Sequence, residues 1–154
     1  TLGKMHFTGL SVFVRDDVRL IAEMWNAFAR NLHRISRRKV PERFFQVSYW
    51  LEDQSMNGFF CMAAAETEDL SVVPDDMCGK TAAPAKYLRF IHKGISRDVG
   101  RTYECIYGTV LPATEFVLPL PYNIELYGEG YRGPNDPESE SEIYIPVAVA
   151  SSEA

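Results

Sequence analysis

The chain has 154 residues, of which 46% are hydrophobic and 24% charged, values typical of one globular domain and not of a disordered or fibrous chain. Sixteen Lys and Arg against twenty-one Asp and Glu give a net charge of −5, which opposes the attraction to phosphate that nucleic-acid binding requires. Every apolar run is far shorter than the roughly 20 residues that span a bilayer, so we expect neither direct nucleic-acid binding nor a membrane anchor.

The cysteines and histidines argue against metal binding and against a disulfide framework. Cys61, Cys78 and Cys105 are scattered and form no CxxC pair, and the three histidines lack the spacing of paired metal ligands. Three unpaired cysteines suit a reducing compartment. We therefore expect a cytoplasmic protein without a metal.

In chain order, residues 7–14 are rich in β-branched and aromatic side chains and predict a strand. Apolar residues then recur at helical spacing from Val18 through Trp25 to Leu32 and predict a helix. Residues 45–51 and 59–65 predict two strands joined by a turn at 53–58. The first half thus reads strand, helix, strand, strand.

The second half repeats this order after a loop at 69–79. Residues 86–91 predict a strand, residues 99–110 a helix that Pro112 ends, and residues 122–127 and 142–149 the fifth and sixth strands. We expect an α+β fold and one domain over residues 1–154, with halves at about 5–80 and 81–150. The strands of both halves would form a mainly antiparallel sheet with two helices on one face and a central pocket.

A glycine motif in the loop at 128–140 matches the sequence pattern of a cofactor site but lacks the helix that such a site requires. Gly128, Gly130 and Gly133 match GxGxxG, which in dinucleotide-binding proteins opens a helix that holds the pyrophosphate. Here Pro134 follows, and Glu129 would repel phosphate. The segment is better explained as a hairpin loop, and no cofactor is expected.

The predicted strand at 122–127 places a carboxylate among apolar neighbours. Because side chains alternate along a strand, Asn123, Glu125 and Tyr127 share one face. An unpaired ionised carboxylate inside a sheet is costly. Glu125 is therefore exposed to solvent, paired with a basic residue, or placed to meet a ligand cation, and the pattern alone leaves all three alternatives open.

Aromatic residues in both halves could line a pocket around this carboxylate. Aromatic faces attract cations, and tyrosine hydroxyls can orient a ligand. We therefore expect the ligand-binding residues to be drawn from Glu125, Tyr127, Trp25, Phe28, Tyr49, Phe60, Tyr87 and Tyr107.

Four segments, 84–94, 106–112, 124–127 and 142–147, together with the order of elements, resemble the GyrI-like effector-binding family, whose small-molecule domains are also fused to AraC-type and MerR-type regulators. The resemblance covers nearly the whole chain. It implies two strand-helix-strand-strand units around a central pocket, and a buried Glu on the fifth strand that recognises cationic lipophilic compounds. That Glu matches Glu125. Free-standing members of this kind include proteins carried on mobile genetic elements.

Three functions follow from these observations. The leading hypothesis is binding of an organic cation by a monomer or a homodimer, with Glu125 as the countercharge. The resemblance also implies two alternatives: hydrolysis of reactive electrophiles by Glu125 and Tyr127, and protection of DNA gyrase through a protein contact. Whether the protein is an enzyme is left open.

Overall fold

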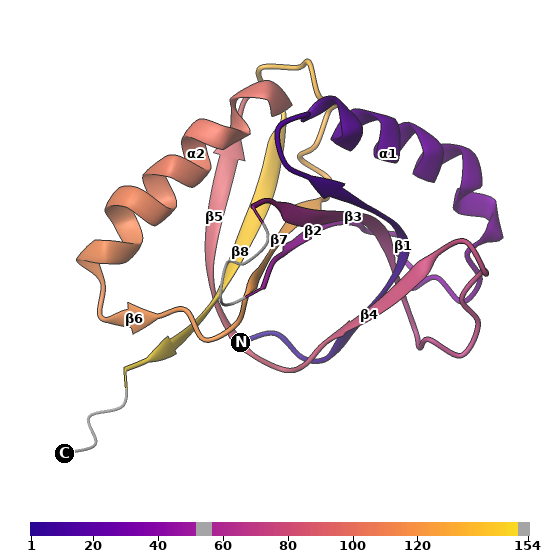
Figure 1. Ribbon diagram of the computed structural model, residues 1–154, viewed down its shortest axis with the longest axis horizontal. Coiled ribbons are helices and arrows are strands. Elements are labelled where there is room, and N and C mark those ends of the chain that lie inside the picture. Colours follow the sequence, from indigo (N-terminus) through magenta and orange to yellow (C-terminus); the bar gives the residue numbers. More distant parts are fainter. Residues whose placement is uncertain (52–56, 151–154) are drawn as a thin grey trace.

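The fold consists of one large sheet and two main helices, in a computed structural model that describes residues 1–51 and 57–150 (Figure 1). The strands of the described part are β1 (Met5–Val14), β2 (Phe44–Tyr49), β3 (Phe59–Thr67), β4 (Cys78–Ala82), β5 (Lys86–Lys93), β6 (Phe116–Val117), β7 (Tyr122–Tyr127) and β8 (Glu140–Val149). The helices are α1 (Arg19–Asn31) and α2 (Val99–Cys105), and π and 3-10 turns extend α2 to Ala113. Among these residues, no helix combines the length and apolarity needed to cross a membrane.

The strands follow the order β4-β1-β3-β2-β7-β8-β5, and β6 pairs with the outer end of β8. Every strand pairing is antiparallel, so the expected α+β fold with a mainly antiparallel sheet is confirmed. The two halves of the chain meet where β2 pairs with β7, and this register places Gln46 opposite Glu125.

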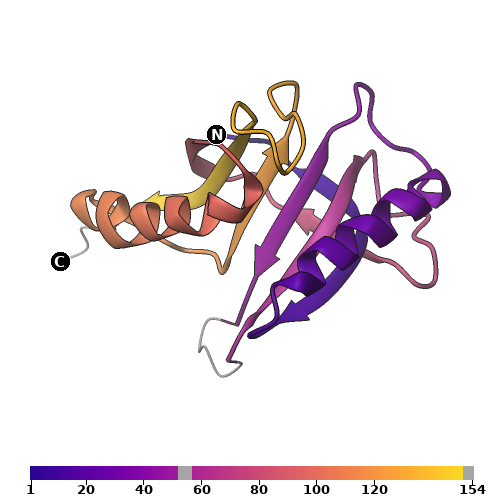
Figure 2. The ribbon, with the colours of Figure 1, turned by 90° about the horizontal axis from the view of Figure 1, so that it is seen from above.

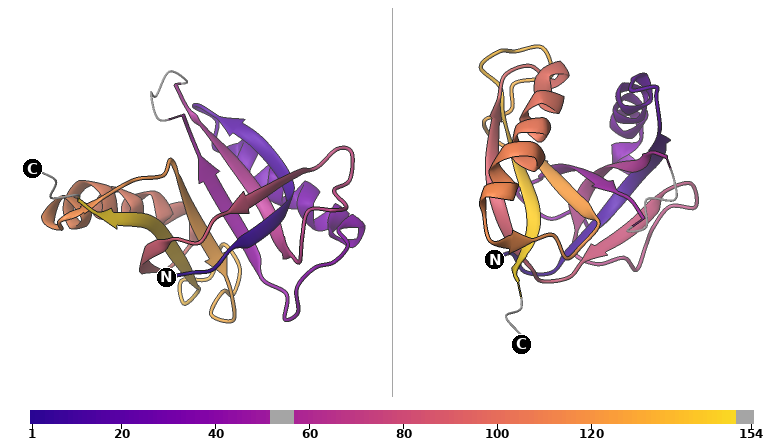
Figure 3. Two further views of the ribbon diagram at one scale, coloured as in Figure 1. Left: turned by 90° about the horizontal axis from the view of Figure 1, so that it is seen from below. Right: turned by 60° about the vertical axis from the view of Figure 1, so that its left-hand side comes forward.

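Both helices cover the same face of the sheet, as expected. Seen from above, α1 and α2 lie in front of the strands at opposite ends, and seen from below the strands lie in front of both helices (Figures 2 and 3). Under α1, Met24 and Phe28 pack against Ala63 of β3, and in the second half Ile106 packs against Ile143 of β8. The middle strands β2 and β7 therefore have their helix-side face between the two helices.

The other face of the sheet has a core of its own. Phe7, Phe45, Met62 and Ile124 are buried there, from four neighbouring strands. Since alternate residues of a strand point to opposite faces, β3 contributes Met62 and Ala64 to this core and its odd-numbered residues to the helix side. The central strands are thus buried on both faces.

The structure corrects several boundaries expected from the sequence. The short strands β4 and β6 were not predicted, because the sequence of β4, Cys-Gly-Lys-Thr-Ala, has neither apolar alternation nor β-branched enrichment. Helix α1 begins only at Arg19, and Val18 is 68% exposed, so its assignment to the apolar stripe was wrong. The predicted turn at 53–58 lies largely outside the described residues.

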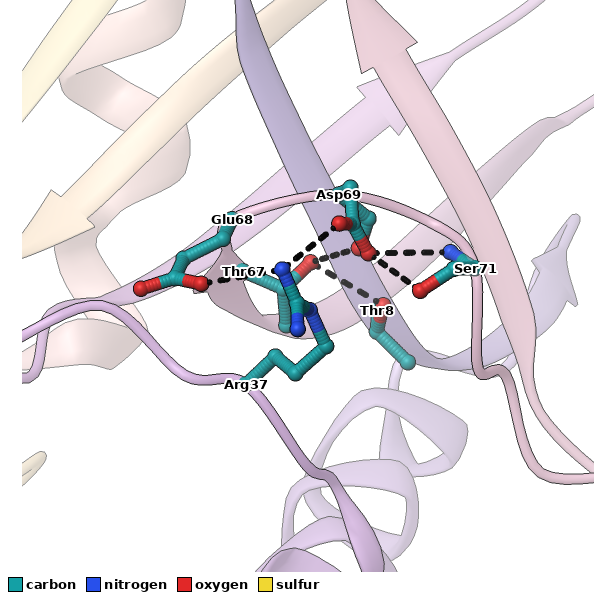
Figure 4. A network of polar contacts seen from close by, with 6 residues as sticks. All are labelled: Thr8, Arg37, Thr67, Glu68, Asp69 and Ser71. Atoms are coloured by element: carbon teal, nitrogen blue, oxygen red, sulfur yellow. Dashed lines mark hydrogen bonds and ion pairs between the residues drawn. The ribbon is translucent and has the colours of Figure 1, made fainter.

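The connection between α1 and β2 is fixed to the end of β3 by polar contacts (Figure 4). The guanidinium of Arg37 lies 3.2 Å from a carboxylate oxygen of Glu68 and 2.9 Å from one of Asp69. The Arg37 backbone has a positive φ of 59°, and its carbonyl accepts a hydrogen bond from the Glu68 amide at 2.9 Å. These contacts hold the chain as it enters β2, which carries Gln46.

Gly9 allows β1 to approach β3 more closely than a side chain would permit. A Cβ atom at this position would lie 1.8 Å from the carbonyl oxygen of Ala63, a backbone atom that cannot rotate away. We expect Gly9→Ala to lower the free energy of unfolding by about 2 kcal/mol, as overpacked interiors do. Urea denaturation would measure this. Gly128→Ala is the matched control, because Gly128 lies outside the helices and strands and nothing lies within 4 Å of its added Cβ, and an unchanged Gly9→Ala midpoint would contradict the prediction.

Candidate ligand-binding site

Glu125 lies near the centre of the sheet, on the face that carries the helices. It is only 3% exposed and stands between Gln46 of β2 and Ile143 of β8. The Gln46 amide Nε2 donates a hydrogen bond to Glu125 Oε2 at 2.8 Å. Within the described part of the chain, no Lys, Arg or His nitrogen comes within 4 Å of this carboxylate. The alternative that Glu125 is exposed to solvent is therefore wrong. Its side-chain partner in the described part of the chain is the neutral amide of Gln46 and not a basic residue.

The amide of Gln46 is oriented by helix α1. The indole Nε1 of Trp25 donates to Gln46 Oε1 at 2.8 Å, and an indole can only donate. Gln46 must therefore present its oxygen to Trp25 and its NH₂ group to Glu125. This chain of two hydrogen bonds links a helix and two strands that are remote in sequence, and it gives the carboxylate a donor that carries no charge.

Burial changes the proton affinity of the site. Desolvation raises the pKa of Glu125 from 4.5 to about 7, although hydrogen bonding from the hydroxyls of Tyr127 and Tyr103 works in the opposite direction. Burial, and next the nearby Glu125 charge, raise the pKa values of Tyr127 and Tyr103 well above 10. Both phenols therefore remain donors at neutral pH, while the carboxylate is divided between its two protonation states.

A cavity of about 570 Å³ opens on the same face of the sheet. The residues that line it include Ser48, Trp50, Phe59, Tyr103, Tyr107 and Asn123. Side chains of α2 and its extension therefore form one wall, and β2, β3 and β7 form the others. Such a volume is within the range of about 300–1,000 Å³ found for small-molecule sites.

A polar cluster stands between this cavity and the carboxylate. The Tyr103 hydroxyl lies 3.4 Å from Asn123 Oδ1, and Asn123 Nδ2 donates to the Tyr107 hydroxyl at 3.1 Å. Asn123 precedes Glu125 by two residues on the same face of β7, and the Tyr103 hydroxyl also interacts with Glu125. The carboxylate is therefore a neighbour of Tyr103, a residue of the cavity wall.

The structure brings together some of the predicted site residues and separates others. Trp25, Tyr127 and Tyr107 lie on the helix side of the sheet with Glu125, where Trp25 packs edge-on against Tyr127 at 5.3 Å between ring centroids. Phe28 is on the same side, but it is 3% exposed and belongs to the core beneath α1.

Tyr49, Phe60 and Tyr87 lie on the opposite face of the sheet. Tyr49 and Tyr87 pack against the core of that face, and Phe60 stacks on Tyr49 with ring centroids 5.1 Å apart. The physical reason is the alternation of strand side chains, since Phe60 precedes Cys61 and Tyr49 follows Ser48, both of which face the helices. These three residues therefore do not share the helix-side site with Glu125.

Apart from Ser48, Trp50, Phe59 and Tyr103 of the cavity wall, the site residues that were not predicted are Gln46 and Asn123. Both are polar residues buried in strands that are otherwise mostly apolar, with exposed fractions of 9% and 6%. Polar residues at Gln46 and Ser48, two positions apart within an apolar strand, were the available signal that this face meets something polar.

Comparison with known proteins identifies the family. Residues 1–147 match the sequence model of Cass2, described as an integron-associated effector binding protein. The chain belongs to this family. The effector-binding resemblance seen in the sequence is thereby confirmed, and small-molecule binding is supported for this Cass2-family chain in general terms.

Relatives of known sequence and structure agree with the assignment. The chain is 30% identical over 128 residues to the transcriptional regulator BrlR of Pseudomonas aeruginosa. The aligned region covers 82% of this chain and 46% of BrlR, so the chain spans about half the length of that regulator. A structure of SAV2435 bound to tetraphenylphosphonium is 15% identical with a TM-score of 0.74, covering 96% and 90% of the two chains. The integron cassette protein VCH_CASS2 from the mobile metagenome of Vibrio cholerae is 15% identical with a TM-score of 0.65, covering 96% and 92%.

Proposed function

We propose that this protein binds a lipophilic, aromatic organic cation on the helix face of the sheet, with Glu125 as the countercharge. The observation that carries the proposal is the buried carboxylate whose protein partners are neutral amide and phenol groups. A carboxylate taken out of water gains most from a cation that is itself weakly hydrated, because little solvation is then lost on binding.

The surrounding side chains suit such a ligand. Trp25, Tyr103, Tyr107 and Tyr127 offer aromatic faces near the carboxylate, and a desolvated cation over a ring gains up to about 2 kcal/mol. Tyr103 and Tyr107 stack with ring centroids 6.3 Å apart on the wall of the cavity. A ligand of several rings could fill the cavity and direct its charge at Glu125.

Access to Glu125 requires a small movement of the cavity wall. The contact between the Tyr103 hydroxyl and Asn123 is long, at 3.4 Å, so the main polar interaction lost on displacing this hydroxyl is the one with Glu125, which a bound cation would replace. Rotation of the Tyr103 ring would bring the carboxylate into contact with the cavity. The ligand's rings would then replace the contacts that Tyr103 gives up.

The proposal is tested by calorimetric titration with tetraphenylphosphonium at pH 8, where Glu125 is mostly ionised. Triphenylphosphine oxide, a neutral molecule with similar rings, is the control. We expect a Kd on the order of micromolar for the cation and at least about tenfold weaker binding of the neutral compound. Equal affinities would show that charge recognition plays no part and would refute the proposal.

Hydrolysis of a reactive electrophile is a second candidate, favoured by the proton affinity of Glu125. A carboxyl with a pKa of about 7 beside the Tyr127 hydroxyl suits general-base catalysis. The nearby Cys61 is no nucleophile, because burial raises the pKa of its thiol to about 12. Incubation with an aryl epoxide followed by chromatography tests this candidate: a diol that accumulates over many turnovers, faster than without protein, indicates hydrolysis, and recovery of intact epoxide contradicts it.

A further inference from the structure

A second cavity lies on the face of the sheet that carries no helix. Its volume is about 460 Å³, and its wall includes Tyr49 and Trp50 at the end of β2, Lys80 of β4, and Pro121 and Tyr122 at the start of β7. The cavity therefore combines aromatic rings with a cation on its wall, whereas the site on the helix face combines aromatic rings with a buried carboxylate.

Lys80 is held at this cavity by an aromatic ring. It shares a face of β4 with Cys78 and Ala82, which pack on the core of that side of the sheet. Its Nζ lies 3.7 Å from the centroid of the Tyr49 ring. In the part of the chain that the structure describes, no carboxylate oxygen lies within 4 Å of this ammonium group.

The aromatic walls are fixed by contacts outside the cavity. The Tyr49 hydroxyl is hydrogen-bonded to Ser11 Oγ at 2.8 Å, and its ring stacks on Phe60 at an interplanar angle of 11°. The Tyr122 hydroxyl is hydrogen-bonded to that of Tyr87 at 2.6 Å. The rings of Tyr49 and Tyr122 are therefore already held in place before a ligand binds, which favours binding.

We propose that this cavity is a second ligand site, which takes an aromatic anion: a ring system carrying a carboxylate or sulfonate that pairs with Lys80 and lies against Trp50 and Tyr122. The site uses neither Glu125 nor any other residue of the cation site except Trp50, which lines both cavities. Apart from this shared ring, the proposed anion site does not rest on the proposed cation binding. The protein would hold ligands of opposite charge on opposite faces of one sheet.

The probe for this site is 8-anilinonaphthalene-1-sulfonate, titrated by fluorescence at pH 8 into folded wild type, Lys80→Met and Lys86→Met. Lys86 is the matched control, because its Nζ also lies over a ring, that of Phe116 at 5.2 Å, but outside the cavity. We expect one saturable site per chain, a Kd about tenfold weaker in Lys80→Met, and a change within about twofold in Lys86→Met. An unchanged Lys80→Met, or an equal loss in both variants, would overturn the proposal.

Two further titrations separate this site from the cation site. The probe should bind Glu125→Gln as tightly as wild type, and saturating tetraphenylphosphonium should not expel it. Loss of the probe in either experiment would place it on the helix face and overturn the proposal. If tetraphenylphosphonium fails to bind at all while binding of the probe still depends on Lys80, then the cation proposal fails and the anion site stands.

Discussion

Glu125→Gln should bind tetraphenylphosphonium about a hundredfold more weakly than wild type at pH 8, a loss of about 3 kcal/mol. The substitution removes the countercharge but keeps the shape of the side chain. The new amide can still accept the hydrogen bond that Gln46 Nε2 donates, so the contacts through Trp25 remain possible. Calorimetric titration of both proteins measures the difference directly.

Glu104→Gln is the matched control for this comparison. Glu104 is exposed on α2 and is the neighbour of Tyr103, and both substitutions change the net charge from −5 to −4. If tetraphenylphosphonium is attracted only by the overall negative charge of the protein, its affinity should fall equally in the two variants. That loss should be small, because exposed charges are screened by salt. Such an equal, small loss would contradict a direct role for Glu125, whereas a loss confined to Glu125→Gln would support it.

The sequence predicts the strand that carries Glu125 and shows that Asn123 and Tyr127 share its face, because both depend on local alternation. The partner of Glu125 depends on more. Gln46 is 79 residues away in sequence, and it meets Glu125 only through the register between β2 and β7. Local periodicity contains no information on that register, so the uncharged environment of the carboxylate could not be predicted.

The faces of the aromatic residues were harder to assign for a related reason. The segment from Phe59 to Ala65 is apolar at every position, since β3 is buried on both sides, and such a run does not show which residues point where. Phe60 was therefore grouped with Glu125, although it stacks on Tyr49 on the opposite face. On that face the Tyr49 ring lines the second cavity, with Phe60 stacked on it and Lys80 nearby.

The stability of the wild-type protein should fall as pH rises from about 4.5 to 7, and the difference from Glu125→Gln should reach about 3 kcal/mol above that range. The folded state raises the pKa of Glu125 from 4.5 to about 7, so between these values it binds more protons than the unfolded state. Stability from this group is thus fully present below pH 4.5 and is lost as the buried carboxyl ionises. The glutamine side chain of the variant cannot ionise, so the variant should not lose this stability as the pH rises.

Thermal denaturation of both proteins between pH 5 and 8 measures this effect, with Glu125→Gln melting roughly 6–12 °C above wild type at pH 8 for a chain of this size. The comparison cancels titration of the surface carboxylates, which both proteins share. Parallel melting curves across the range would show that Glu125 ionises normally. The same proton links stability to binding: if a cation requires the ionised carboxylate, its affinity should fall about tenfold for each pH unit below 7. The charge that weakens the empty protein at neutral pH is then the one that a bound cation neutralises.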